Sequence, residues 1–155
     1  MTQGDDEWSD SADDAAPQPA YEVPADVLPV GEVYDWYVRG RDLLEGGNPE
    51  AAAELLARAH VEAPDSASVL ETLARALFDA RRYAEAASRF TELVEASPDS
   101  DYARFGLGLS RMRLGDAVGA AEQLAMAATM RPARADYQQA LREARATVRA
   151  REQQQ

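Results

Sequence analysis

Apolar residues recur at steps of three and four positions from residue 33 to residue 134, which is the period of an α-helix. Within residues 67–100, one run of this kind consists of Leu70, Leu73 and Leu77, and the next consists of Ala86, Ala87, Phe90 and Leu93. A polar break, DARRY, separates the two runs. The pattern predicts two amphipathic helices joined by a tight turn.

The helical pattern repeats with a fixed period of 34 residues. Pro64, Pro98 and Pro132 lie 34 residues apart, and the first two begin the identical tripeptide PDS. Proline ends a helix, and the following Asp or Ser is suited to cap the next one. The chain therefore divides into three helix pairs, residues 33–66, 67–100 and 101–134.

The turn inside each pair has its own polar signal. In the first pair it is EGGNPE, where Asn48 is expected to cap the second helix and Pro49 to stand in its first turn. In the third pair it is LGDA. A final, arginine-rich helix is expected over residues 135–152, followed by a disordered end, residues 153–155.

Aligning the three pairs shows columns of small residues beside columns of large ones. The small columns are Gly40, Ala74, Gly108; Ala52, Ala86, Ala120; and Ala53, Ala87, Ala121. A column of large residues consists of Leu56, Phe90 and Leu124. Small residues let paired helices approach closely, and the large ones are expected to fill the space between them.

These columns resemble the tetratricopeptide repeat (TPR), a family of 34-residue helix–turn–helix units. Its signature matches at Trp36, Gly40, Ala52, Ala59 and Pro64; at Leu73, Ala74, Leu77, Tyr83, Ala86, Phe90 and Pro98; and at Leu107, Gly108, Ala120, Ala127 and Pro132. The resemblance implies an all-α fold, a right-handed superhelix (α-solenoid) of three TPR units over residues 31–152 with a C-terminal capping helix. Three arginines depart from the usually apolar pattern, Arg39, Arg104 and Arg111, and their stems are expected to lie along apolar surface.

Composition separates the repeats from the N-terminal segment. The chain has 155 residues and a formal net charge of −12, and residues 1–32 hold nine acidic side chains and no basic one. Residues 1–30 are rich in Asp, Ser, Ala and Pro, so we expect an acidic, disordered tail. The remaining 19 acidic side chains nearly balance the 16 basic ones, all of which are arginine. The alanine- and arginine-rich composition is typical of a GC-rich bacterial genome.

The composition also excludes several classes of function. The absence of cysteine excludes disulfides and thiolate metal sites, and the absence of lysine excludes Schiff-base catalysis. An acidic chain is a poor nucleic-acid binder. The N-terminus lacks the apolar run of a secretory signal, and no stretch reaches the roughly 18 apolar residues of a membrane span, so a cytoplasmic location without membrane insertion is expected.

No motif indicates an enzyme. His60 is the only histidine, and Val94 and Ala128 occupy its column in the other pairs, so a packing role is expected. The segment FGLGLS lies within a predicted helix and not after a strand, so it is not a nucleotide-binding loop. We therefore expect no catalytic residue, cofactor or metal.

The resemblance implies a site on the face of each first helix that lines the concave groove. The predicted groove residues are Tyr34, Tyr37, Arg41, Leu44, Arg75, Phe78, Tyr102, Phe105, Leu109 and Met112. The alternative is that these side chains only pack neighbouring helices together. One TPR subclass clamps chaperone C-terminal carboxylates with lysine and asparagine; the corresponding positions here are Tyr37, Arg41, Thr72, Tyr102 and Gly106, of which only Arg41 suits that role.

The sequence thus favours a non-catalytic scaffold or adaptor, a monomer or weak homo-oligomer, that binds a partner protein or peptide in an aromatic, arginine-containing groove. The alternative is a self-association module that uses the same apolar surface. An extended ligand with apolar side chains and some negative charge would suit the groove. Residues 21–32, YEVPADVLPVGE, have that composition, and they are expected to act either as a pseudo-ligand, as a cover of the first helix, or simply as a linker.

Overall fold

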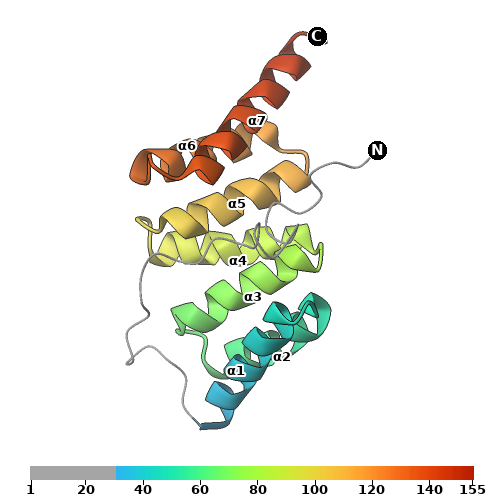
Figure 1. Ribbon diagram of the computed structural model, residues 1–155, viewed down its shortest axis with the longest axis vertical. Helices are drawn as coiled ribbons and strands as arrows, with labels where there is room; N and C mark the ends of the chain where they lie inside the picture. The colour runs from blue at the N-terminus through green and yellow to red at the C-terminus, as the bar shows by residue number, and fades with distance from the viewer. Residues whose placement is uncertain (1–30) are drawn as a thin grey trace.

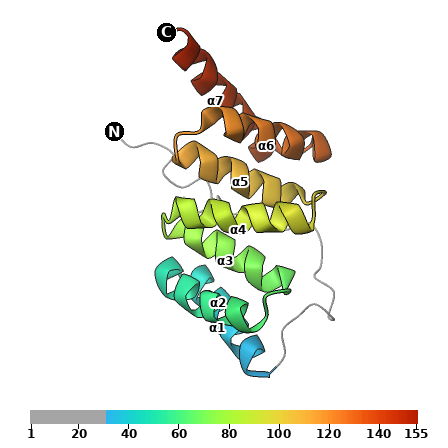
Figure 2. The same cartoon turned by 180° about the vertical axis from the view of Figure 1, so that it is seen from behind.

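The helices begin and end close to the breaks in the apolar pattern. The structure is a computed structural model that describes residues 31–155; the predicted disordered tail, residues 1–30, lies outside the described residues. In the described part there are seven helices and no strand: α1 (Gly31–Glu45), α2 (Pro49–Glu62), α3 (Ala67–Asp79), α4 (Tyr83–Ala96), α5 (Asp101–Arg113), α6 (Ala117–Met130) and α7 (Ala135–Glu152). They follow one another along the long axis of the molecule (Figure 1), and the view from behind shows the same order (Figure 2). The all-α solenoid is therefore confirmed.

The serines of the two PDS tripeptides cap the helices that follow them, as predicted. The Ser66 hydroxyl accepts a hydrogen bond from the Val69 backbone N–H at 3.4 Å, and Ser100 accepts one from the Ala103 N–H at 3.2 Å. Each serine therefore satisfies one of the free N–H groups at a helix start. Asn48 stands at the N-cap of α2 as predicted, but its side chain makes no capping hydrogen bond, because its amide Nδ2 donates to the Gly46 carbonyl, 3.4 Å away.

Each turn inside a pair has one residue in the left-handed region of backbone space. Gly47 has a φ of 83° and Gly115 a φ of 86°, and Arg81, at the same position of the second pair, has a φ of 62°. Glycine adopts this conformation freely because it has no Cβ, whereas another residue loses about 1–2 kcal/mol. The turn geometry is thus kept in the second pair despite a residue that disfavours it.

Within each pair, a small residue of the first helix faces a large residue of the second. A Cβ added to Gly40 would lie 2.6 Å from Leu56 Cγ, and one added to Gly108 would lie 2.6 Å from Leu124 Cγ. Ala74 and Phe90 occupy these positions in the middle pair, and both are fully buried. The interpretation of the Gly40/Ala74/Gly108 and Leu56/Phe90/Leu124 columns as a close helix contact is therefore confirmed in the first and third pairs.

The alanine column of the second helices should be intolerant of larger residues. Ala86 is completely buried in α4, so Ala86→Leu should lower the free energy of unfolding by about 1–3 kcal/mol, because the added atoms push the paired helices apart. Urea unfolding measures the change. Ala84→Leu is the matched control, because Ala84 is exposed on the same helix. Equal unfolding midpoints for the two variants would show that the helix pairing is misplaced.

The arginines that depart from the apolar pattern keep their charged ends hydrogen-bonded or in solvent. Arg104 Nε donates to the Pro98 carbonyl at 2.8 Å, and its guanidinium also donates to Gln123 Oε1 at 3.0 Å. Arg111 reaches the Gly119 carbonyl at 3.4 Å, and Arg39 is exposed. These arginines are therefore accommodated without burying an unpaired charge.

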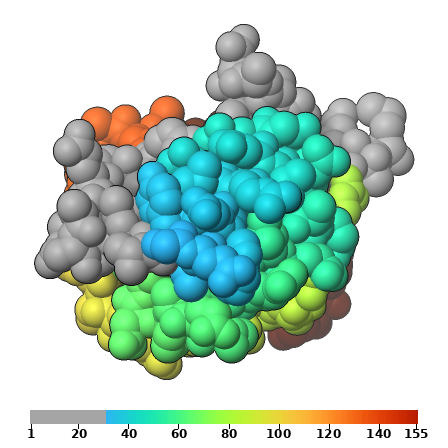
Figure 3. Space-filling model, turned by 90° about the horizontal axis from the view of Figure 1, so that it is seen from below, coloured from blue at the N-terminus to red at the C-terminus, as the bar shows by residue number. Residues whose placement is uncertain are grey.

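The first helices of the pairs form the inner side of the stack. Each helix packs on its neighbours in the chain, and in addition α1 contacts α3, α3 contacts α5, and α5 contacts α7. Helices that approach their next-but-one neighbours lie on the inside of a curved array, so α1, α3, α5 and α7 line the concave side. Figure 3 looks at the N-terminal end, where α1 (blue) and α2 (cyan-green) form the surface.

The last helix, α7, buries side chains only in its first half, although Arg151 near its end still donates a hydrogen bond to the Gly115 carbonyl at 2.7 Å. Its buried residues are Tyr137, Ala140, Leu141 and Ala144, and the second half extends beyond the stack (Figure 1). Residues 153–155 form an exposed turn after it. None of the helices between residues 31 and 155 is both long enough and apolar enough to cross a membrane.

Candidate concave binding surface

The ten predicted groove residues lie on three first helices, and they differ widely in exposure. Tyr34 and Arg41 are exposed, and Arg75 and Met112 are half-buried. The other six are buried: Tyr37, Leu44, Phe78, Tyr102, Phe105 and Leu109. Side chains that a partner can reach directly are therefore a minority of the predicted set.

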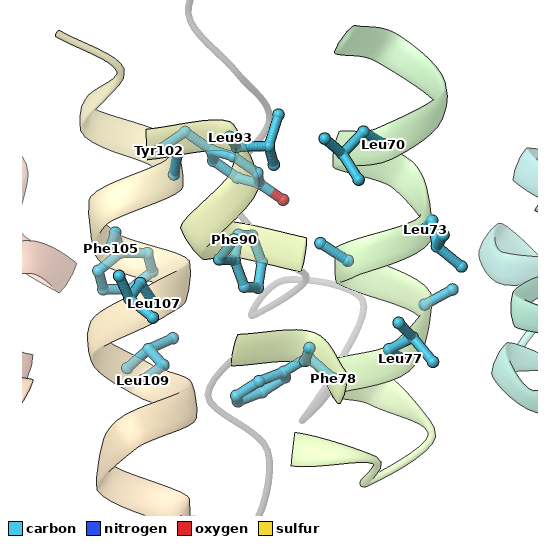
Figure 4. Packing of buried hydrophobic residues seen from close by; sticks show 14 of the residues in the cluster. Leu70, Leu73, Leu77, Phe78, Phe90, Leu93, Tyr102, Phe105, Leu107 and Leu109 are labelled. Atoms are coloured by element: carbon cyan, nitrogen blue, oxygen red, sulfur yellow. The ribbon is translucent and has the colours of Figure 1, made fainter. Parts of the chain in front are cut away.

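Several of the buried aromatic residues contact neighbouring helices. The Phe105 ring stacks on Tyr137 of α7, with centroids 4.5 Å apart, and Tyr102 meets the Phe90 ring of α4 edge-on at 6.5 Å. Phe78 meets Tyr83 edge-on at 5.2 Å. Figure 4 shows Phe90 and Phe78 in the space between α3 and α5. These rings therefore have a packing role, and their part in binding stays a prediction.

Charged residues of both signs share the inner face of α3. Glu71, Arg75 and Asp79 follow at steps of four residues and therefore lie on one side of the helix. Glu71 is only 8% exposed, and Arg75 Nε is buried without a hydrogen bond to any described residue. Arg75 is one of the two arginines of the predicted groove, which favour some negative charge in the ligand. Its charge is offset by two carboxylates, a feature that the four-residue spacing in the sequence could have revealed.

Two tyrosine hydroxyls near this surface are held in the protonated state. Burial raises the pKa of Tyr102 strongly, while the nearby Arg75 opposes the shift and Glu71 adds to it. Burial also raises the pKa of Tyr137, and the hydroxyl donates a hydrogen bond to Asp101 Oδ2 at 2.7 Å, which raises it further. Asp101 in turn faces Arg131 Nε at 3.5 Å. Both hydroxyls stay protonated at neutral pH and are not suited to act as bases, and that of Tyr137 is a structural hydrogen-bond donor.

His60 stands apart from this surface. It lies in the last turn of α2, and its pKa is lowered by burial and, to a lesser degree, by the charge of Arg89. Its Nδ1 atom has no hydrogen-bond partner among the described residues. No group of three or more His, Asp or Glu side chains suited to a metal ion occurs in residues 31–155. A half-buried, neutral imidazole is consistent with the expected packing role.

Solved structures with a similar fold are TPR domains and MamA proteins. The Sgt2 TPR domain from Aspergillus fumigatus superimposes with a TM-score of 0.73 at 19% identity, over 84% of this chain and 88% of that one. A MamA point mutant gives a TM-score of 0.69 at 24% identity, over 84% and 74%. The first TPR of Spaghetti (RPAP3), bound to the HSP90 peptide SRMEEVD, gives 0.67 at 16% identity, over 76% and 93%. These likenesses show the fold.

Sequence comparison decides the family. No curated protein matches the chain. The family model for the tetratricopeptide repeat, in contrast, matches residues 37–87 and 71–135, which together cover more than half of the chain. The match spans all three helix pairs and the start of α7. The chain therefore belongs to the tetratricopeptide repeat family.

Proposed function

We propose that this chain is a non-catalytic TPR scaffold of the cytoplasm that binds an extended segment of a partner protein on its concave side. The observation that carries the proposal is the alignment of α1, α3 and α5 along the inner side, where aromatic side chains lie beside arginines. Repeat arrays use such inner surfaces for binding. Two structural neighbours support this use of the fold, because they hold the peptides SRMEEVD, from HSP90, and SGPTIEEVD, from HSP70.

The accessible side chains define the ligand that the surface favours. Arg41 is exposed and lies over the Tyr37 ring, 5.7 Å from its centroid, so its donors face solvent beside an aromatic surface. Arg75 adds a half-buried donor, and a ligand carboxylate would supply an acceptor to either arginine. Since Glu71 and Asp79 flank Arg75, a strongly anionic ligand would be repelled there. The favoured ligand is therefore apolar or aromatic with one or two carboxylates.

This ligand differs from the HSP90 and HSP70 peptides that the two structural neighbours bind. Four of the five positions that correspond to the carboxylate clamp hold Tyr37, Thr72, Tyr102 and Gly106, none of which is a cation. Gly106 also has no room for a larger side chain, because a Cβ there would overlap the Phe90 ring. A peptide with a C-terminal Asp would find only Arg41. We therefore expect recognition of an internal segment and not of a chain terminus.

Substitutions at exposed residues test the groove without disturbing the core. Displayed random 12-residue peptides selected on the full chain should share an aromatic or apolar residue near Asp or Glu. Tyr34→Ala and Arg41→Glu should each weaken the best peptide about tenfold or more, the usual size for an interface anchor, as measured by fluorescence anisotropy. Both residues are exposed, so circular dichroism should stay helical.

Arg39→Glu is the matched control for Arg41→Glu. Arg39 is exposed on the same helix and has the same charge, but it lies outside the stripe that includes Arg41. An equal loss of binding in the two variants would indicate a non-specific charge effect. Unchanged binding in Tyr34→Ala and Arg41→Glu would place the site away from the concave side.

Self-association is the second candidate function, and the outer helix α6 favours it. Three large apolar side chains on α6 are exposed: Val118 (59%), Met126 (44%) and Met130 (38%). A second copy could bury such a surface in a symmetric contact. Light scattering at micromolar concentration distinguishes the two functions, because a monomer that still binds the selected peptides removes the self-association reading.

A further inference from the structure

A hollow of about 360 Å³ lies at the C-terminal end of the array, between α6 and α7. It is lined by Val118, Ala121, Glu122, Arg145, Val148 and Arg149. Val118 is 59% exposed at its edge, and Val148 is half-buried. The hollow shares no residue with the concave surface described above, so it is a separate feature of the molecule.

The repeat register shows whether a further helix can pack on α7. α7 continues the series of first helices, and each earlier first helix is covered by a second helix whose large residue sits on a small one, as Leu124 sits on Gly108. The corresponding position of α7 is Arg142, which is exposed. A long charged side chain there blocks a second helix from packing as it does in the repeats. The register therefore argues against a fourth repeat packed on α7, and the hollow, which Arg142 does not line, stays open to another segment.

The chemistry of the hollow indicates which segment it accepts. Valine and alanine side chains form its apolar part, and Arg145 and Arg149 stand exposed beside them, against the single carboxylate of Glu122. Residues 142–152 contain four arginines and two glutamates. The ligand that fits is a large apolar side chain with carboxylates close to it in the sequence, since arginine binds carboxylates with directed donors.

We propose that the occupant is the chain's own residues 5–14, DDEWSDSADD, with the Trp8 indole in the hollow and the neighbouring carboxylates at Arg145 and Arg149. This segment lies outside the described residues; its sequence contains six acidic residues, no basic one, and a single large apolar side chain. Its charge is thus opposite to that of the α7 end. Residues 21–32, which suit the concave groove, are a different part of the chain.

The connection between the segment and the repeats is long enough for this contact. The 23 residues from Trp8 to Gly31 span up to about 75 Å when extended. Only three steps between first helices, at about 8–10 Å each, separate α1 from α7. A tether of this length gives an effective concentration in the millimolar range, so even a weak contact is populated. The docked segment covers part of the apolar surface that includes Val118.

Nuclear magnetic resonance of the full chain tests the contact from both sides. The Trp8 indole N–H resonance is assigned by its loss in Trp8→Phe. In Arg145→Glu/Arg149→Glu this resonance should move, and its intensity should become more sensitive to a soluble relaxation agent, because the indole is released to solvent. In Trp8→Ala the amide resonances of Val118 and Val148 should move; this second variant changes no residue of the helices and so leaves the fold intact.

The control matches the charge change at the other end of the array. Arg39→Glu/Arg58→Glu has the same change in net charge on exposed residues of α1 and α2, and it should leave the Trp8 indole resonance in place. Coincident Trp8 resonances in the wild type and in Arg145→Glu/Arg149→Glu would overturn the proposal. So would unmoved Val118 and Val148 amides in Trp8→Ala. Shifts that vanish on dilution would also overturn it, because the segment would then belong to another copy.

Discussion

Phe90→Ala should lower the free energy of unfolding by about 3–5 kcal/mol, the range for removing a fully buried aromatic side chain. Phe90 lies on α4, its ring approaches Gly106 of α5 at a point that leaves no room for a Cβ, and it meets Tyr102 of the same helix edge-on. Figure 4 shows the ring between α3 and α5. Removing the ring therefore leaves a cavity at the contact between the second repeat and the third.

Urea unfolding followed by circular dichroism measures this effect. Phe90→Leu should lose less than Phe90→Ala, because leucine fills the same column in the other two repeats, at Leu56 and Leu124. Ser88→Ala, at an exposed position of α4, is the control and should change the free energy by less than about 0.5 kcal/mol. An unfolding midpoint of Phe90→Ala equal to that of Ser88→Ala would contradict the packing described for this ring.

Alkaline pH should unfold the protein steeply above about pH 10. Tyr102 and Tyr137 are both buried, and their pKa values are raised above the ordinary value of about 10. Above pH 10 the unfolded chain loses these two protons while the folded chain keeps them, so the equilibrium shifts toward unfolding. The stabilisation that comes from the two buried, protonated hydroxyls is fully present below pH 10. Above pH 10 the free energy of unfolding falls by about 1.4 kcal/mol per pH unit for each tyrosine.

The slope of stability against pH is the quantity to measure, since it counts the protons involved. Tyr102→Phe and Tyr137→Phe should each reduce the slope above pH 10 by about half, even though Tyr137→Phe also removes the hydrogen bond to Asp101. Tyr34→Phe is the control, because it makes the same substitution at a tyrosine that is exposed on α1. A slope that is the same in all three variants would mean that neither buried hydroxyl governs the alkaline transition.

The repeat architecture could be predicted from the sequence because each of the three repeats carries the same local pattern. The 34-residue period, the caps at Ser66 and Ser100 and the pairing of Gly40 with Leu56 are all local patterns that occur more than once. The conformation of Arg81 could not be predicted in this way. Glycine at the same turn position of the other two repeats indicates a positive φ, whereas arginine disfavours this conformation. At Arg81 the surrounding structure imposes the positive φ.

The exposure of the predicted groove residues could not be predicted from a single helix. Helical spacing places Tyr102, Phe105 and Leu109 on one face, but it does not show what lies opposite. The partner of Phe105 is Tyr137, which occupies a column that holds Val69 and Ala103 in the second and third repeats. No pattern shared by the repeats predicts this contact. The sequence therefore does not show which side chains of the stripe pack on other helices and which are exposed.

The chain of neighbour contacts has a consequence for how fast the protein folds. Each helix packs chiefly on the helices just before and after it in the sequence, and the farthest frequent contacts join next-but-one helices. Little loop-closure entropy is lost before such contacts form, and helical proteins of this low contact order fold in microseconds to milliseconds. Folding can also begin in any repeat and spread to its neighbours. The central repeat, which has neighbours on both sides, should then show the slowest amide hydrogen exchange, with faster exchange toward α1 and α7.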